Sequence, residues 1–299
     1  MKTSAECLAC FLRQTVQVGR VCHCSEESQI ASVKAVSRLL PEMDTTKSPP
    51  QNAYHVYQAI HVAAGIEDPY RELKNESNAQ ALKLLESLRL EVLCDDVPLL
   101  AAARFAIAGN IIDYGAMSNP DIDKALAQSR SSVPVVDHST AFLARINTLE
   151  KGARILYLAD NCGEIVYDAL LLEGLHKSGF DITVAVKDGP IINDALLEDA
   201  YAAGLDKYAR IISNGTRCPG TVLDLCSSEF VEIFETADLI ISKGQGNFES
   251  LSEADRDIVF LLTVKCRVAA RHLAELTDTA PGDVPGNGEM AIYFSRAAK

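Results

Sequence analysis

Two short segments of the chain combine carboxylate and amide side chains in a pattern suited to a metal ion. Asp160 and Asn161 follow the apolar run 154–159, and Asp194 lies a few residues beyond the apolar run 182–186. Carboxylate and amide oxygens are the ligands that Mg²⁺ or Mn²⁺ prefers. Because neighbouring parallel strands end at one edge of a sheet, we expect these three side chains to hold one divalent ion. Such a set leaves positions for water and substrate, as a catalytic metal site requires.

The residues after Asn161 are expected to begin a helix that faces the same site. Gly163 allows a tight turn, and the first free N–H groups of the helix, at Gly163 and Glu164, could receive a phosphate. Asp168 lies one to two turns further along this helix. It could face the substrate or hold a residue that contacts it, or it could be a solvated helix residue. The three candidate metal ligands also have a purely structural alternative. Asp160, Asn161 and Asp194 could instead cap turns and helices.

A third segment, SKGQGNFE at 242–249, follows the apolar run 239–242. Lys243 could meet a phosphate as a point charge, while the backbone at Gly244 allows a close approach. Asn247 lies in the same loop and is a further candidate for substrate binding. The alternative is a glycine-rich turn with a solvated lysine. We favour a phosphate-binding loop.

The second half of the chain has the pattern of a parallel sheet covered by helices. Short apolar runs alternate with amphipathic stretches such as 165–177 and 195–203, which predicts a doubly wound, Rossmann-like sheet with helices on both faces. The runs that we expect to be strands are 154–159, 182–186, 210–213, 239–242 and 258–264. We therefore predict a three-layer α/β/α domain with a mainly parallel sheet over 151–299, which binds the metal and the phosphate.

Residues 1–150 show helical spacing of apolar residues almost throughout. Pro41 ends one predicted helix, and another begins at the Ser-Pro-Pro of 48–50 and stops at Gly65. Further helices are expected near 77–92, 98–114 and 138–150. These patterns predict an α-helical N-terminal domain over 1–150 that contributes to the ligand cleft.

Composition and charge exclude several functional classes. The chain has 299 residues, of which 48% are hydrophobic, so it can bury a large core without disulfide bonds. A net charge of -13 repels phosphate backbones, so nucleic acid is not an expected partner. No apolar run approaches the roughly 20 residues that span a bilayer, and no secretory signal is recognisable. We expect a cytoplasmic protein with reduced cysteines and no membrane association.

Common catalytic motifs are absent from the sequence. The turn after the first strand reads DNCGE, so it does not match the dinucleotide fingerprint G-x-G-x-x-G. The chain has no ATP-binding loop of the form G-x-x-x-x-G-K-[ST] and no serine-hydrolase elbow of the form G-x-S-x-G. That turn is also not Asp-x-Asp, so a phosphoaspartate nucleophile is not supported.

Six sequence blocks resemble the metal-dependent damage-control phosphatases, a family long described only as a domain of unknown function. In chain order they are CLACFLRQ (7–14), DPYRELKNESN (68–78), AGNIIDYGA (108–116), DNCGEIVYDALL (160–171), KDGPIINDAL (187–196) and ADLIISKGQGNFESL (237–251). The CLAC start is similar to the archaeal and bacterial branch. The resemblance covers nearly the whole chain and implies a helical N-terminal domain on a three-layer α/β/α domain.

The resemblance also implies roles for individual residues. It implies that Asp160, Asn161 and Asp194 hold the catalytic ion, and that Lys243 binds the substrate phosphate. The motif of Asn110 and Asp113 would face the same cleft, which agrees with their spacing of three on one helical face. A cap near the end of that helix is the competing explanation for this pair.

The N-terminal cysteines form a second, weaker candidate metal site. Cys7, Cys10, Cys22 and Cys24 lie within 18 residues and could bind zinc through sulfur. Against this, Cys7 and Cys10 lie on the apolar face of a predicted helix, where cysteine behaves as a small hydrophobic residue. The spacing also departs from the usual paired knuckles.

Together these features predict a phosphatase that hydrolyses a small phosphorylated metabolite, such as a sugar phosphate, in metabolite damage control. The cofactor would be Mn²⁺, Co²⁺, Ni²⁺ or Mg²⁺, which would activate a water for attack on phosphorus. Two alternatives are a Rossmann-like carboxyl methyltransferase, which has been proposed within the family, and a non-catalytic protein that binds a phosphorylated metabolite. Dependence of hydrolysis on a divalent ion would separate the first reading from the other two.

Overall fold

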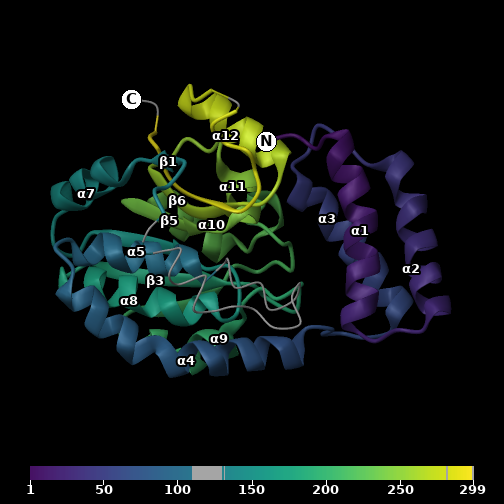
Figure 1. Cartoon of the computed structure of the whole chain (residues 1–299), viewed down its shortest axis with the longest axis horizontal. Helices are drawn as coiled ribbons and strands as arrows, with labels where there is room; N and C mark the ends of the chain where they lie inside the picture. The colour runs from purple at the N-terminus through teal and green to yellow at the C-terminus, as the bar shows by residue number, and fades with distance from the viewer. Residues whose placement is uncertain (110–129, 131, 281, 298–299) are drawn as a thin grey trace.

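The computed structural model describes residues 1–109, 130, 132–280 and 282–297 of the 299-residue chain. These residues form one mixed α/β structure with a central sheet, helices on both faces, and a group of three helices to one side (Figure 1). Within this part of the chain, no helix combines the length and the apolar character that crossing a membrane requires.

The sheet has seven strands in the order β1-β7-β6-β5-β2-β3-β4 within the described residues. The strands are β1 Val136–Asp137, β2 Arg154–Leu158, β3 Asp181–Val186, β4 Arg210–Ser213, β5 Leu239–Lys243, β6 Ile258–Val264 and β7 Glu289–Ser295. All pairings are parallel except that of β6 with β7. The five predicted strands are present and parallel, whereas β1 and β7 were not predicted.

Alternating side chains of the central strands enter two separate cores, because successive residues of a strand point to opposite faces. On β2, Ile155 and Tyr157 belong to one core, and Leu156 and Leu158 belong to the other. The first core lies under α4, α5, α7 and α8, and the second lies under α10, α11 and α12. The predicted three-layer α/β/α architecture with a mainly parallel sheet is thus confirmed.

The helices that cover the sheet are α4 Arg71–Cys94, α5 Pro98–Ala108, α7 Ser139–Thr148, α8 Glu164–Lys177, α9 Leu197–Ala202, α10 Ser228–Thr236, α11 Gln245–Leu251 and α12 Arg267–Thr277. Short 3₁₀ helices occur at η1 Leu40–Glu42, η2 Leu205–Lys207 and η3 Leu223–Leu225. The carboxyl ends of β2, β3 and β5 lead directly into the three loops that carry the candidate site residues.

Helices α1 Ala5–Val21, α2 Glu26–Leu39 and α3 Pro49–Ala64 form a separate bundle at one side of the sheet domain (Figure 1). Its core includes Phe11, Val36 and Val56. As the sequence predicts, α3 begins with prolines and is capped by Gly65 in the left-handed conformation, with φ +68°.

The boundary between the two predicted domains differs from the expected position near residue 150. Helices α4 and α5 share a core with α8 and the sheet, so they form a layer of the α/β unit and not part of the bundle. The apolar spacing of a helix shows that one face is buried, but not which partner buries it. That is why the sequence pattern assigned these helices to the N-terminal domain.

Candidate functional site

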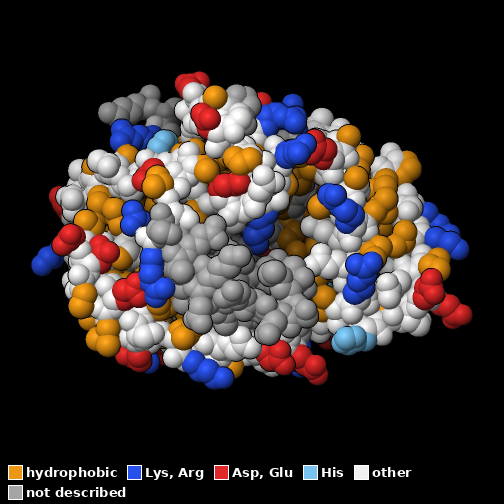
Figure 2. All heavy atoms as spheres, viewed as in Figure 1, with side chains coloured by type: hydrophobic (Ala, Val, Ile, Leu, Met, Phe, Trp, Pro, Cys, Tyr) orange, Lys and Arg blue, Asp and Glu red, His pale blue; other side chains and the backbone are white. Residues whose placement is uncertain are grey.

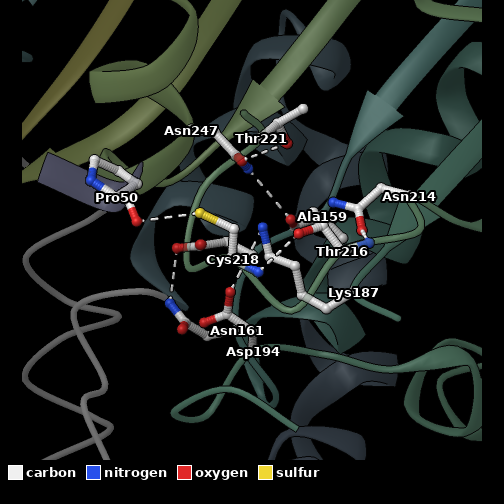
Figure 3. Close-up of polar contacts among 12 residues, drawn as sticks. Pro50, Ala159, Asn161, Lys187, Asp194, Asn214, Thr216, Cys218, Thr221 and Asn247 are labelled. Carbon is white, nitrogen blue, oxygen red and sulfur yellow. Dashed lines mark hydrogen bonds and ion pairs between the residues drawn. The ribbon is translucent and has the colours of Figure 1, made fainter. Parts of the chain in front are cut away.

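Backbone hydrogen bonds fasten the β2–α8 loop to the β3–α9 loop. Asn161 and Asp194 form an isolated antiparallel bridge. The N–H of Cys162 donates to the carbonyl of Asn193 at 2.9 Å, and the N–H of Ala195 donates to the carbonyl of Asp160 at 2.8 Å. These bonds bring the three predicted metal ligands Asp160, Asn161 and Asp194 to one place, where Asn161 and Asp194 lie next to one another (Figure 3).

The side chains at this place form a compact, buried set. Asp160 is 8% exposed and Asp194 is 3% exposed. Nδ2 of Asn161 donates to Oδ2 of Asp160 at 2.8 Å and to Oε2 of Glu164 at 3.3 Å. Burial, together with the negative charge of Asp160, raises the pKa of Asp194 to about 7, although Lys187 opposes this shift. Two carboxylates are therefore held close together out of water.

A buried lysine stands beside each part of this set. Nζ of Lys187 lies 3.7 Å from Oδ2 of Asp194, which is an ion-pair distance but longer than a hydrogen bond (Figure 3). On the other side, Nζ of Lys243 donates to Glu164, to Oδ1 of Asp168 at 2.8 Å and to the carbonyl of Ala106 at 2.8 Å. Since Asn161 also contacts Glu164, both lysines are linked to the predicted metal ligands.

The charges of this buried cluster do not balance. Its charged side chains, all less than a tenth exposed, are Asp160, Glu164, Asp168, Asp194, Lys187 and Lys243. The four carboxyl groups outnumber the two ammonium groups, although Lys74, which pairs with Asp68 at 2.8 Å, also acts on Asp194. Burial is the main cause that raises the pKa of Glu164 to about 8, against the opposing charge of Lys243. A divalent cation between Asp160 and Asp194 would supply the missing charge, so the donor set fits such an ion.

The candidate metal ligands are oxygen donors of two kinds, carboxylate and amide. No three His, Cys, Asp or Glu side chains in the described part of the chain are grouped so that they could hold an ion. The predicted site instead combines two carboxylates with one amide, a set suited to Mg²⁺ or Mn²⁺.

The third loop lies directly against the first. Gly244 has φ +78°, and a Cβ atom at this position would lie 1.9 Å from Oδ2 of Asp160. Only glycine allows the backbone to pass the carboxylate this closely and in this conformation. The order of β5 beside β2 in the sheet creates this contact.

A cleft of about 360 Å³ opens beside the candidate metal ligands, between the helical bundle and the carboxyl edge of the sheet. Asp160, Asn161 and Asp194 line one part of it. Helices α1 and α3 supply another wall, and the start of α11 and the β6–α12 loop complete it. Figure 2 shows the hollow, with apolar atoms inside and Lys and Arg side chains at its margin. The bundle therefore contributes to the ligand cleft.

A family model described as the damage-control phosphatase ARMT1-like domain matches residues 3–279. The chain belongs to this family. Its relatives include the damage-control phosphatase PH1575 of Pyrococcus horikoshii, which is 35% identical over 91% of this chain and 94% of that protein. A damage-control phosphatase of Archaeoglobus fulgidus is 31% identical over 91% of this chain and 96% of that protein.

A solved structure and a more distant relative extend the comparison. The crystal structure of a DUF89-family protein from Pyrococcus horikoshii aligns with a TM-score of 0.86 at 31% identity, covering 99% of this chain and all of that one. A 4'-phosphopantetheine phosphatase of Mus musculus is 24% identical over 54% of this chain, which corresponds to 23% of the mouse protein.

In this member of the damage-control phosphatase family, Lys243 points into the protein interior and not into the cleft, where the sequence predicted a contact with phosphate. Its side chain is fully buried, and three acceptors surround its ammonium group. Asp168 is equally buried and accepts hydrogen bonds from Lys243 and from the hydroxyl of Tyr157 at 2.7 Å. Asp168 is therefore neither a solvated residue nor a wall of the cleft, but a partner that holds Lys243.

Two further expected substrate contacts are replaced by internal ones. The N–H of Gly163 donates to Oδ1 of Asn78 at 2.6 Å, so it is occupied within the protein. Asn247 is 1% exposed; its Nδ2 donates to the carbonyl of Lys243 at 2.8 Å, and its Oδ1 accepts from Thr221 at 2.8 Å. Asn247 therefore braces the β5–α11 loop from inside, and Figure 3 shows its contacts with Thr221 and with the carbonyl of Ala159. Asn110 and Asp113 lie outside the described residues.

The four N-terminal cysteines do not surround one ion. Cys7 and Cys10 lie in the first turns of α1, whereas Cys22 follows its last residue. Fifteen residues of helix separate Cys7 from Cys22 by roughly 22 Å. A four-cysteine zinc site is therefore wrong. Burial, and contact with Cys24, raise the pKa of the Cys22 thiol to about 11, so it is a thiol at neutral pH.

Several residues of the site were not predicted from the sequence. Lys187 was expected only as part of a loop, yet it is 2% exposed and faces Asp194. Arg13 and Lys265 line the cleft from α1 and from the end of β6. The position of Lys187 directly after the apolar run 182–186 could have indicated that it lies at the site. Nothing in the sequence distinguishes Arg13 or Lys265 from surface cations.

Proposed function

We propose that this protein is a phosphatase that hydrolyses a small phosphorylated metabolite with the help of a divalent ion at Asp160, Asn161 and Asp194. The observation that carries the proposal is a buried cluster at the edge of a cleft in which four carboxyl groups outnumber two lysines. The names of the relatives, three of which are phosphatases, support the same reaction class. We place the enzyme in the cytoplasm, because all nine cysteines are thiols.

The residues of the site divide the work as follows. When bound, the ion would polarise the phosphate ester and promote the attack of water on phosphorus. Asp160 and Asp194 supply negative ligands from two loops. Asn161 presents its carbonyl oxygen, because its Nδ2 is engaged by Asp160 and Glu164. The ligands are thus oriented before substrate arrives, which limits reorganisation during the reaction.

The two buried lysines form ion pairs on the interior side of the proposed metal ligands. Lys187 fixes and balances Asp194, and Lys243 does the same for Glu164, which in turn orients Asn161. A direct contact between Lys243 and the substrate phosphate stays a prediction, and it would require Lys243 to exchange one of its present acceptors for a phosphoryl oxygen. Mn²⁺, Co²⁺, Ni²⁺ and Mg²⁺ are the candidate ions.

Chelation and replacement of the ion test the proposal. Purified protein should hydrolyse p-nitrophenyl phosphate or a hexose phosphate, lose this activity in EDTA, and regain it with one of the four ions. Asp194→Ala should lower kcat/KM by a factor on the order of 10³, because a charged ligand is lost. Asp188→Ala is the matched control, since Asp188 is exposed in the same loop and its side chain is bonded only to Ser213 among the described residues.

The outcomes distinguish the candidate functions. Wild-type rates in folded Asp194→Ala protein would show that this site does not perform the reaction. Binding of phosphorylated metabolites without turnover under any ion would favour the non-catalytic alternative. Metal-independent binding of S-adenosylmethionine would favour the methyltransferase.

A further inference from the structure

Among the charged side chains that line the cleft, the acidic ones have hydrogen-bond or ion-pair partners, whereas two basic ones have none among the described residues. Glu6 pairs with Arg271 at 3.8 Å, and Oε1 of Glu249 accepts a hydrogen bond from Gln245 at 2.7 Å. Arg13 and Lys265 line the same cleft, but their side chains form no ion pair or hydrogen bond with another described residue. In a chain with a net charge of -13, two unpaired cations at one cleft are available for an anion.

The sheet fixes the distance between Lys265 and the candidate metal ligands. Lys265 follows β6 and Asp160 lies two residues beyond β2, while β5 separates these two strands. Two steps between neighbouring strands correspond to roughly 10 Å. The backbone of Lys265 is also held in place, because its N–H donates to Oε1 of Gln245 at 2.7 Å. The backbone of Lys265 is thus held roughly 10 Å from that of the candidate metal ligands, and its exposed side chain extends from there.

Three aromatic rings also line this cleft. Phe11 of α1, Tyr57 of α3 and Tyr70 line the cleft, and all three are at most 4% exposed. Arg13 follows Phe11 on the same helix, so the bundle supplies both the rings and one cation. Apolar walls with a few polar groups are typical of sites that enclose the body of a small ligand.

From this arrangement we propose a substrate class, an inference that rests on the phosphatase function above. The substrate is a phosphomonoester that carries a second anionic group, a carboxylate or another phosphate, on the order of 10 Å from the scissile phosphorus. The scissile phosphate lies at Asp160, Asn161 and Asp194, and the second anion lies between Arg13 and Lys265. The carbon skeleton between the two anions lies against the ring wall.

A matched pair of ligands tests the second anion site. 6-Phosphogluconate and glucose 6-phosphate have the same carbon count and the same phosphate position, but only the first has a carboxylate at the far end. Binding of their non-hydrolysable methylene phosphonate analogues to the metal-loaded protein is measured by calorimetry, and kcat/KM is measured with the phosphates. Wild type should prefer the carboxylate ligand by about 10-fold in both measurements, and the preference should shrink in high salt.

Variants assign that preference to the two cations. Arg13→Gln and Lys265→Met should each reduce the preference about threefold, and the double variant should abolish it, while affinity for the glucose 6-phosphate analogue stays within about twofold. Arg20→Gln on the same helix and Lys207→Met are controls, because neither residue lines the cleft. Equal affinity of wild type for the two analogues, or equal weakening of both by the variants, would overturn the inference.

The same data separate this inference from the phosphatase proposal. If no ester is hydrolysed with any of the four ions but the analogue preference and its dependence on Arg13 and Lys265 persist, the reaction is wrong and the anion site stands. If glucose 6-phosphate and 6-phosphogluconate are hydrolysed with equal kcat/KM, the reaction stands and the second anion site is wrong.

Discussion

Replacing Gly244 by alanine should disable the proposed metal site without unfolding the protein. The new Cβ would lie 1.9 Å from Oδ2 and 2.2 Å from Cγ of Asp160, so the carboxylate must move by more than about 1 Å to restore van der Waals contact. A displacement of about 1 Å in catalytic geometry costs roughly 10²-fold in rate. We therefore expect kcat/KM to fall at least about 100-fold and the affinity for the divalent ion to fall as well.

Gly244→Ala also strains the backbone, and a control variant separates this strain from the clash with Asp160. Gly244 has φ +78° and ψ 163°, a region essentially restricted to glycine, so an alanine there costs about 1–3 kcal/mol of folding free energy even without a clash. Gly152 has φ +82° and no atom within 4 Å of the position that a Cβ would occupy, so Gly152→Ala introduces an alanine at positive φ without a clash. Both variants should lose stability in urea denaturation, but only Gly244→Ala should lose metal-dependent hydrolysis and metal affinity by calorimetry. A folded Gly244→Ala protein with wild-type metal affinity would refute the role of Asp160 as a ligand.

Three further predictions follow from the buried groups. Lys243→Met should lower the free energy of unfolding by about 3–5 kcal/mol in urea denaturation, because it leaves Glu164 and Asp168 buried without their cation; an unchanged midpoint would contradict the ion-pair network. Burial raises the pKa of Glu249 from 4.5 to about 7, so the folded state retains a proton that the unfolded chain releases in this range, and stability falls as pH rises through it. Glu249→Gln should remove about 2–3 kcal/mol of that decline between pH 5 and pH 8 in denaturation curves, and an unaltered pH profile would place the titration elsewhere. Cys22→Ser should leave the zinc content, measured by mass spectrometry, at the wild-type value, and a stoichiometric loss of zinc would contradict the separation of the cysteines along α1.

The five parallel strands could be predicted because each is a short, uninterrupted apolar run that is buried on both faces. β6, Ile258–Val264, is buried at every position, and such strands stand out in the sequence. β7, Glu289–Ser295, also has a buried interior but follows a Gly- and Pro-containing stretch near the end of the chain. Its antiparallel pairing with β6 breaks the alternation of strands and helices, so that pattern gave no reason to expect it.

The convergence of Asp160, Asn161 and Asp194 could be predicted because sheet geometry brings the loops that follow adjacent parallel strands together, and bonds between these loops then align the residues. The orientation of individual side chains could not. Lys243 follows an apolar run in the sequence whether it faces the cleft or the interior, and only the position of α5 and α8 decides. Helix packing supplies the carbonyl of Ala106 and the carboxylate of Glu164, and these turn the lysine inward.

The inward position of Lys243 strengthens the argument for a divalent ion. Had both lysines faced the cleft, substrate phosphate could have been bound by ammonium groups alone, and the buried carboxylates would have remained unpaired. With Lys187 and Lys243 committed to the carboxylates, neither is free for a phosphate, and Asp160 and Asp194 line the wall that would receive it. A phosphate dianion cannot approach such a wall without a cation between them. A divalent ion held by Asp160, Asn161 and Asp194 would supply that charge more fully than a monovalent one and would let a phosphoryl oxygen approach the carboxylates.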